Sequence, residues 1–281
     1  MSIPSGVQVQ AFGTLLKHWR GQQSWSQLDL ACQSEVSQRH ISFLESGRSQ
    51  PSRDMVLHLA TVLAVPLRQQ NVMLTAAGFA PLYSEHDLSA PELAPIQQAI
   101  DFMLHQQDPY PALVIDRYWT LLQANQGALR LMGWLLGDRL STLEQPLNMM
   151  WLMIHPQGLR PYVEDWNTVA VPLVQRLQQE AQSEGPSGPT ARLLQDLRGE
   201  LQDISLATPI ASGPLPVLPI TFVKPDGKAH QRLSFFTIIS TLGTPRDITL
   251  QELRIETLFP TDAATAAMMQ SLRFSSAATT A

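Results

Sequence analysis

The spacing of apolar and capping residues between positions 26 and 52 predicts two short helices joined by a tight turn. Ser26 lies three residues before Asp29, so these side chains can satisfy free amide groups at the start of the first helix. The chain then turns near Glu35, and Ser37 can cap the second helix. Together these positions describe a helix-turn-helix. The residues expected to face inward are Leu28, Leu30, Ala31, Val36, Ile41 and Leu44.

The second of these helices keeps a mainly polar face on its outer side. The outward residues are Gln38, Arg39, Ser42 and Phe43. In a DNA-binding helix-turn-helix, the N-terminal half of this helix enters the major groove, where Gln and Arg can make bidentate contacts with adenine and guanine. The alternative is an ordinary helical hairpin with polar surface residues.

Amphipathic segments on both sides of this motif favour the DNA-binding interpretation. Residues 8–22 place apolar side chains on one face, and residues 53–63 and 68–77 predict two further helices. Five short helices form a compact domain, so we assign residues 1–80 to an all-α helix-turn-helix domain.

Beyond residue 80 the pattern changes to a linker followed by mixed strands and helices. Three prolines, at positions 81, 91 and 95, and mixed charge indicate a surface linker at residues 81–94, and residues 183–189 predict a flexible break. Asn125 is expected to cap a helix. The helices are expected at residues 95–106, 125–136, 146–154, 161–182 and 191–202, and two strands at residues 112–116 and 119–124.

After residue 202 the apolar residues recur with period two. This pattern predicts a hairpin that turns at Pro225-Asp226-Gly227 and one more strand at residues 252–259. Two strands, a run of helices and three strands give an antiparallel sheet with helices packed on one face, an α+β fold. That order is the PAS arrangement, which commonly holds a ligand between sheet and helices. We assign residues 95–273 to this domain and residues 274–281 to a tail.

Composition agrees with two domains of different charge. The chain has 281 residues, of which 44% are apolar, so it can bury a sizeable core. Residues 1–80 hold six Lys or Arg against four Asp or Glu, whereas the rest holds thirteen against twenty. A mildly basic head on an acidic body is expected if only the head approaches a polyanion such as DNA.

The single cysteine, Cys32, excludes an intramolecular disulfide framework and a multi-cysteine zinc site. We expect it to be a small core residue. Neither a signal sequence nor an 18-residue apolar run is evident, so we expect a cytoplasmic protein with no membrane partner.

Residues 1–80 resemble the XRE, or phage-repressor/Cro-like, DNA-binding domains. The resemblance implies base readout by Gln38, Arg39 and Ser42, and for Gln27 a contact with phosphate or with Gln38. The residues that carry the resemblance are Arg20, Ser26-Gln27-Leu28, Leu30-Ala31, Val36-Ser37, Ile41, Leu44-Glu45, Gly47-Arg48 and Pro51-Ser52. The candidate DNA contacts are Gln27, Ser37, Gln38, Arg39, Ser42, Phe43 and Arg48.

Two positions in this domain have a structural interpretation. In the family that it resembles, the residues matching Arg20 and Glu45 form an ion pair, so Arg20 is expected to be scaffold rather than a phosphate contact. Glu35 stands where the family usually has Gly, because the backbone there tends to be left-handed. A side chain at such a position costs about 1 kcal/mol.

The second part of the chain resembles the ligand-binding domain of MmyB-like bacterial regulators. The resemblance implies a transcription regulator whose PAS-like domain binds a small, apolar molecule, with long-chain fatty acids as the ligand class. It is carried by Pro109-Tyr110-Pro111-Ala112-Leu113-Val114, Trp119, Ala124-Asn125, His155-Pro156, Gly158-Leu159-Arg160-Pro161, Trp166, Pro225-Asp226-Gly227, Leu233-Ser234-Phe235-Phe236, Leu242-Gly243-Thr244-Pro245 and Leu250-Gln251-Glu252-Leu253-Arg254-Ile255-Glu256.

Soft and aromatic side chains in the helical segments also favour an apolar ligand, since Met adapts to irregular cavities. For any single one of them, core packing is the alternative. Arg160 could hold a ligand carboxylate through its planar fork, or it could form a surface ion pair. The candidate ligand-binding residues are Asn125, Met150, Trp151, Arg160, Trp166 and Phe236.

No phosphate-binding glycine loop, His-Glu-x-x-His helix or Gly-x-Ser-x-Gly elbow is present, so we expect no enzymatic activity. We expect no cofactor other than a possible bound fatty acid. The partners expected are a double-stranded DNA operator, a small apolar ligand and a second copy of the chain, because one recognition helix reads few base pairs. Two alternatives stay open: a second domain that only dimerises, and a PAS-like enzyme or haem or flavin sensor.

Overall fold

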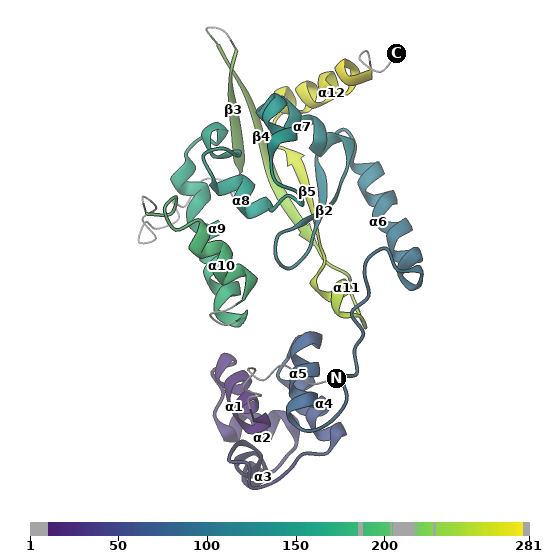
Figure 1. The fold of residues 1–281 in the computed structure, drawn as a ribbon, viewed down its shortest axis with the longest axis vertical. Coiled ribbons are helices and arrows are strands. Elements are labelled where there is room, and N and C mark those ends of the chain that lie inside the picture. Colours follow the sequence, from purple (N-terminus) through teal and green to yellow (C-terminus); the bar gives the residue numbers. More distant parts are fainter. Residues whose placement is uncertain are drawn as a thin grey trace. The chain divides into compact units, whose positions relative to one another are not determined.

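The computed structural model describes residues 11–184, 188–202, 204, 217, 219–226 and 229–277 (Figure 1). Residues 185–187 of the predicted break, Gly227 of the predicted hairpin turn and residues 278–281 of the tail lie outside the described residues. The chain divides into two compact units. The first runs to Ala90 and includes Leu242–Gln251, and the second holds Pro91–Thr241 and the chain from Glu252 onward. The sequence analysis had placed residues 242–251 in the second domain.

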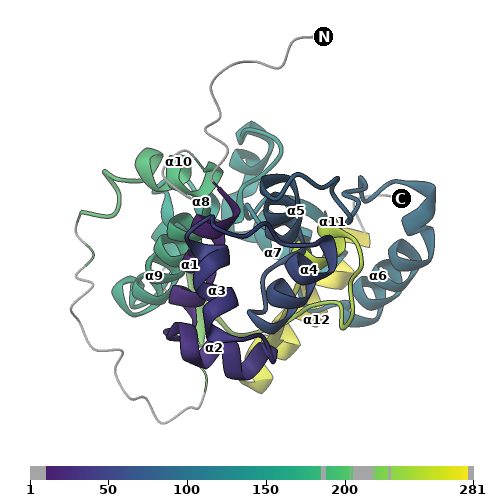
Figure 2. The same cartoon turned by 90° about the horizontal axis from the view of Figure 1, so that it is seen from below.

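The first unit contains the helices expected before residue 80, and α1, α2 and α3 lie side by side in it (Figure 2). Their inward side chains form one apolar cluster that includes Leu16, Leu30, Ile41, Leu44 and Leu59, each at most 1% exposed. The expected helical fold is confirmed. The helices are α1 (Phe12–Gln22), α2 (Gln27–Ser34), α3 (Gln38–Glu45), α4 (Arg53–Val62) and α5 (Leu67–Ala76).

Hydrogen bonds at the helix starts explain why these segments begin where they do. Ser26 Oγ accepts from the Asp29 amide at 3.1 Å, and the Ser26 amide donates to Asp29 Oδ2 at 2.8 Å. Ser37 Oγ accepts from the His40 amide. Glu35 has φ of 55°, so the turn between α2 and α3 is left-handed as expected. The capping predicted from the sequence is confirmed.

Two expectations about α2 are wrong. Leu28 is 54% exposed and Cys32 is also exposed, although both were expected to face inward. They lie four residues apart, on the same side of the helix, whereas the buried side repeats at Leu30, Ala31 and Ser34. Burial of Ser34 is possible because its hydroxyl donates to the Leu30 carbonyl at 2.6 Å.

A largely buried ion pair ties α1 to α3. Arg20 Nε and Nη2 donate to Glu45 Oε1 and Oε2 at 2.6 and 3.1 Å, and the hydrogen bond to Glu45 raises the pKa of Arg20. The two helices also approach closely at Gly13, where a Cβ atom would lie 2.5 Å from the carbonyl oxygens of Leu44 and Glu45. The ion pair expected from the sequence is confirmed.

The second unit is built on an antiparallel sheet with strand order β2-β1-β5-β4-β3 (Figure 1). This arrangement confirms the predicted α+β fold. The strands are β1 (Ala112–Ile115), β2 (Leu121–Ala124), β3 (Ile220–Asp226), β4 (Ala229–Ser240) and β5 (Arg254–Pro260). The helices are α6 (Ala94–Gln107), α7 (Gln126–Leu136), α8 (Met149–Ile154), α9 (Trp166–Glu184), α10 (Pro189–Asp196) and α12 (Ala263–Ala277), with short 3-10 turns at Pro91–Leu93, Gly137–Thr142 and Arg160–Tyr162.

The core of this unit lies between the sheet and the helices α7, α8, α9 and α12. Leu233 and Phe235 of β4 are fully buried in it, and so is Met269 of α12. Helix α12 was not predicted, because its segment is rich in Ala and Ser and lacks a clear apolar stripe. In the part of the chain that the structure describes, no helix is both long and apolar enough to cross a membrane.

The ion pair between Arg20 and Glu45 generates a stability prediction. Arg20→Ala should destabilise the first unit by about 3 kcal/mol, because it leaves the carboxylate of Glu45, 5% exposed, without its charged partner. Hydrogen exchange of the α1 and α3 amides in the full chain would measure this loss.

Arg53→Ala is the matched control, because Arg53 is an exposed arginine of the same unit. It should change stability by less than about 0.5 kcal/mol. If Arg20→Ala and Arg53→Ala have equal effects, the ion pair does not hold α1 against α3.

Candidate functional site

The outer face of α3 presents the predicted base-reading residues together. Gln38 and Arg39 are exposed in the first turn, and Ser42 and Phe43 are half-buried one turn later. The guanidinium of Arg39 lies 5.2 Å from the centre of the Phe43 ring. This stacking leaves the planar fork at the surface, where it can meet a guanine edge.

Three further candidate DNA contacts differ in their surroundings. Ser37 is exposed and uses its hydroxyl as the cap of α3, and Arg48 is exposed just beyond the helix. Gln27 instead donates from Nε2 to Glu45 Oε2 at 2.8 Å, so its amide joins the ion pair of Arg20. The structure gives Gln27 a scaffold contact that the sequence analysis did not anticipate.

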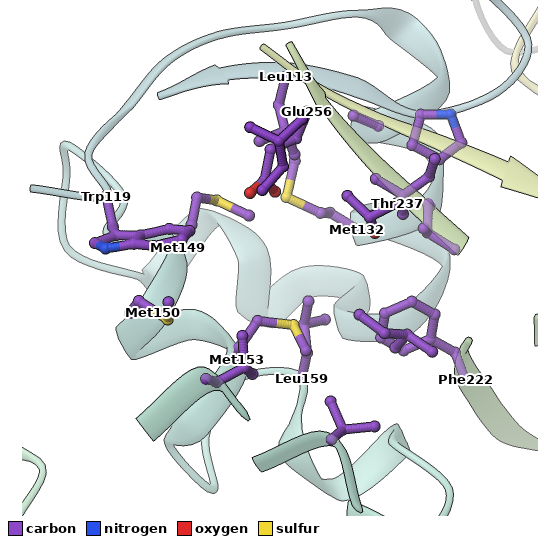
Figure 3. A pocket seen from close by; sticks show the side chains of 18 of the residues that line it. Leu113, Trp119, Met132, Met149, Met150, Met153, Leu159, Phe222, Thr237 and Glu256 are labelled. Atoms are coloured by element: carbon purple, nitrogen blue, oxygen red, sulfur yellow. The ribbon is translucent and has the colours of Figure 1, made fainter. Parts of the chain in front are cut away.

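The second unit contains an apolar cavity of about 360 Å³ between the sheet and helices α7, α8 and α9 (Figure 3). Methionines from α7 and α8 form much of its wall. The apolar lining residues include Leu113, Trp119, Leu131, Met132, Met149, Met150, Met153, Leu159, Val169, Leu173, Phe222, Ile239 and Leu258. The ionisable groups on the wall are Arg176 and Glu256, and Thr237 adds a hydroxyl.

Of the predicted ligand-binding residues, Met150 lines this cavity. Arg160 does not: its Nη1 donates to the Glu200 carbonyl at 3.0 Å, and its guanidinium lies 5.3 Å from the centre of the Trp166 ring. Trp166 itself is not on the wall of the cavity. Trp151 stacks on His155 at 4.3 Å and borders a separate depression next to Asn148.

Phe236 lies on the other face of the sheet, where it stacks on Phe259 at 5.4 Å. Successive side chains of a strand point to opposite faces, so Phe235 enters the core and Phe236 does not. The structure therefore places Phe236 outside the cavity.

Asn125 is a structural residue. Its Oδ1 caps α7 by accepting from the Ala128 amide at 2.8 Å and also accepts from the Ala112 amide at 3.0 Å. Its Nδ2 donates to the carbonyls of Leu104 and Tyr110. With all these hydrogen bonds made inside the protein, the side chain has little capacity left for a ligand.

The sequence analysis missed a group of charged residues beside the cavity. Glu180 of α9 accepts from Trp119 Nε1 at 2.7 Å, from Arg254 Nη2 at 2.8 Å and from Arg176 Nε at 3.3 Å. Both guanidinium groups lie over the Trp119 ring, at 4.4 Å for Arg176 and 4.9 Å for Arg254. We call Trp119, Arg176, Glu180 and Arg254 the indole cluster.

Trp119 reaches this position through a strained turn. Its φ is 66°, in the left-handed region, and the turn is held by Asp116 Oδ1, which accepts from the amides of Tyr118 and Thr120 at 2.8 Å. A left-handed tryptophan is unfavourable by itself, so the surrounding hydrogen bonds fix it. The sequence signals available were an aspartate before the turn and charged residues on the inward side of an otherwise apolar strand, at Arg254 and Glu256.

Glu256 lies in the middle of β5, beside Leu113 of β1 and Ile239 of β4. No described residue forms a hydrogen bond or an ion pair with its carboxylate. Burial raises its pKa, although Arg176 and Arg254 partly oppose this shift. Within the described residues, no group of His, Cys, Asp and Glu side chains could hold a metal ion.

Comparison with protein families matches both units. Residues 11–71 match a helix-turn-helix domain, and residues 96–272 match the ligand-binding domain of MmyB-like transcription regulators. A search of curated proteins gave no match to the chain. The second match covers more than half of the chain, and it coincides with the sheet and the cavity. The chain therefore belongs to the MmyB-like transcription regulators, with a helix-turn-helix domain ahead of the ligand-binding domain.

Proposed function

We propose that this regulator binds an operator through α3 and senses a long-chain fatty acid in the cavity of its second unit. The observation that carries the proposal is the cavity itself. Its volume of about 360 Å³ is in the range of small-molecule sites, and its wall is apolar except for Arg176, Glu256 and the hydroxyl of Thr237. A long alkyl chain with one polar head group fits that distribution.

Arg176 replaces Arg160 as the proposed partner of the ligand carboxylate. Arg176 lines the cavity, and its only hydrogen bond with a described residue runs from Nε to Glu180. The terminal nitrogens are thus available for a carboxylate, which a planar guanidinium binds in a bidentate manner. Arg160 already binds the Glu200 carbonyl and lies outside the cavity wall.

The chain itself provides a route from the cavity to the first unit. Strands β4 and β5 line the cavity through Thr237, Ile239, Glu256 and Leu258, and the segment that joins them, Leu242–Gln251, belongs to the first unit. There the Ile248 amide donates to the Ser84 carbonyl at 2.9 Å, and the Leu67 amide at the start of α5 donates to Gln251 Oε1 at 2.7 Å. This connection favours a ligand-responsive second domain over one that only dimerises.

We further propose that two copies bind two half-sites one helical turn apart, because a single recognition helix reads too few base pairs for genomic specificity.

Arg39→Ala should weaken specific binding to the operator by about 1–3 kcal/mol and relax the preference at one base pair, since Arg39 is expected to reach a guanine edge. The operator would first be selected from random DNA with the unmodified full chain. Binding of each variant to the operator and to single-base changes would then be measured at one salt concentration.

Arg39→Lys is the matched control, because it keeps the charge but removes the bidentate fork. It should retain binding to random DNA and lose the preference at that base pair. An equal loss on all DNA sequences after Arg39→Ala would make Arg39 a phosphate contact.

A C14 to C18 fatty acid should raise the melting temperature of the full chain after bound lipid has been removed. At a hundredfold excess over the dissociation constant, a ligand that binds only the folded state stabilises it by about 2.7 kcal/mol. Differential scanning calorimetry with a series of chain lengths would measure the shift. No shift at any chain length would contradict fatty-acid sensing and favour a second domain that only dimerises.

Arg176→Met should reduce this shift for the fatty acid but not for the alcohol of equal length, because it removes the cation and keeps an apolar stem. Arg160→Met is the control and should leave both shifts unchanged, since Arg160 lies outside the cavity wall. Equal reduction for acid and alcohol would place the carboxylate elsewhere.

A further inference from the structure

A carboxylate stands inside the cavity where an apolar residue would be expected. Glu256 lies on β5, the central strand of the sheet, in one row with Leu113 and Ile239. Figure 3 shows its carboxylate directed into the pocket, toward Met132 and Met149. If this position contributed only to core packing, an aliphatic side chain would be expected there.

This carboxylate differs from the neighbouring one because no described residue donates a hydrogen bond to it or forms an ion pair with it. Glu180 accepts hydrogen bonds from the indole and both arginines of the indole cluster. Glu256 forms no hydrogen bond or ion pair with any described residue. A carboxylate that is largely removed from water without a hydrogen-bond donor is unfavourable, so its presence in an apolar wall needs an explanation outside stability.

The charged groups around Glu256 come from two elements. Arg176 and Glu180 belong to α9, and Arg254 belongs to β5 itself. The other strands and helices that form the wall, β1, β3, β4, α7 and α8, contribute apolar residues and the hydroxyl of Thr237. The positive charge near Glu256 is already shared with Glu180, and burial raises the pKa of Glu256.

A fatty acid bound at Arg176 would bring a second carboxylate into the cavity. Two carboxylates in one apolar site cannot both stay ionised without strong repulsion. If one proton lies between them, the pair carries a single negative charge, which the guanidinium of Arg176 can balance. This proton comes from solvent. Apart from its transfer, no covalent bond is made or broken.

We propose that Glu256 is the residue that selects the ligand's head group: it binds a fatty acid by sharing one proton with the ligand carboxylate, so that binding takes up a proton from solvent. The proposal rests on fatty-acid binding as the function of the cavity. It makes Glu256 and Arg176 two halves of one recognition site, in which the carboxyl group donates to the ligand and the guanidinium balances its charge.

The test measures the dissociation constant of palmitate between pH 6 and pH 9 with the full chain, after bound lipid has been removed. With the unmodified protein the affinity should fall as pH rises, by up to about tenfold per pH unit, because one proton is taken up on binding. Glu256→Gln should bind palmitate with a weaker pH dependence and more tightly at pH 9. The fatty acid's own ionisation affects both proteins equally, so the difference between them isolates Glu256.

Two controls accompany this comparison. Glu92→Gln changes an exposed glutamate outside the cavity wall and should reproduce the unmodified protein. Hexadecanamide has a neutral head group, so its affinity should not fall with pH as that of palmitate does.

A second measurement needs no variant. Titration calorimetry of palmitate at pH 8, in buffers with different ionisation enthalpies, should show net proton uptake on binding. Absence of proton uptake, or equal pH dependence in the unmodified protein and Glu256→Gln, would overturn the role of Glu256 while leaving fatty-acid binding intact. No palmitate binding by either protein at any pH would instead remove the proposed function of the cavity, and this inference with it.

The melting temperature provides an independent check. The pKa of Glu256 is raised in the folded protein, so ionisation costs stability above that pKa and costs nothing below the pKa of the unfolded chain. Glu256→Gln should therefore raise the melting temperature at pH 8 and leave it nearly unchanged at pH 4, in the absence of ligand. A lower melting temperature at pH 8 would mean that the carboxylate stabilises the fold. That result would contradict the proposal that Glu256 is present to bind the ligand.

Discussion

The ligand-binding unit depends on the hydrogen bonds that the carboxylate of Glu180 accepts. It accepts hydrogen bonds from Trp119, Arg176 and Arg254, which come from the β1–β2 turn, from α9 and from β5. Two guanidinium groups can stay beside an apolar cavity only if their charge is balanced and their donors are used. By meeting most of this requirement, Glu180 fixes α9 against the sheet, with Arg176 at the cavity wall.

In the first unit, too, a carboxylate that accepts several hydrogen bonds holds different elements together. Glu45 accepts from Arg20 of α1 and from Gln27 of α2, so one largely buried carboxylate of α3 joins these three helices. The hydrogen bonds satisfy both oxygens, which offsets the cost of removing the charge from water. This pair therefore fixes the C-terminal end of α3, the helix whose first turn carries Gln38 and Arg39.

Because of the connection between β4 and β5, neither unit is one continuous stretch of the sequence. After β4, the segment Leu242–Gln251 packs within the first unit. The chain then re-enters the second unit and forms β5, which pairs with β4 in the cavity wall. In the first unit, His86 Nδ1 lies 2.8 Å from Asp247 Oδ2. A change in the spacing of β4 and β5 on ligand binding would therefore act on a segment that is anchored in the first unit at the start of α5 and at Ser84.

The sequence by itself determined the features that depend on near neighbours. The Ser26–Asp29 cap, the left-handed turn at Glu35 and the order of the strands follow from spacing and residue type. Only the tertiary structure decided which arginine faces the cavity and that Glu256 lies on its wall without a hydrogen bond from any described residue. The reason is that the wall is assembled from segments far apart in the chain, so its charges meet only after the sheet closes against α7, α8 and α9.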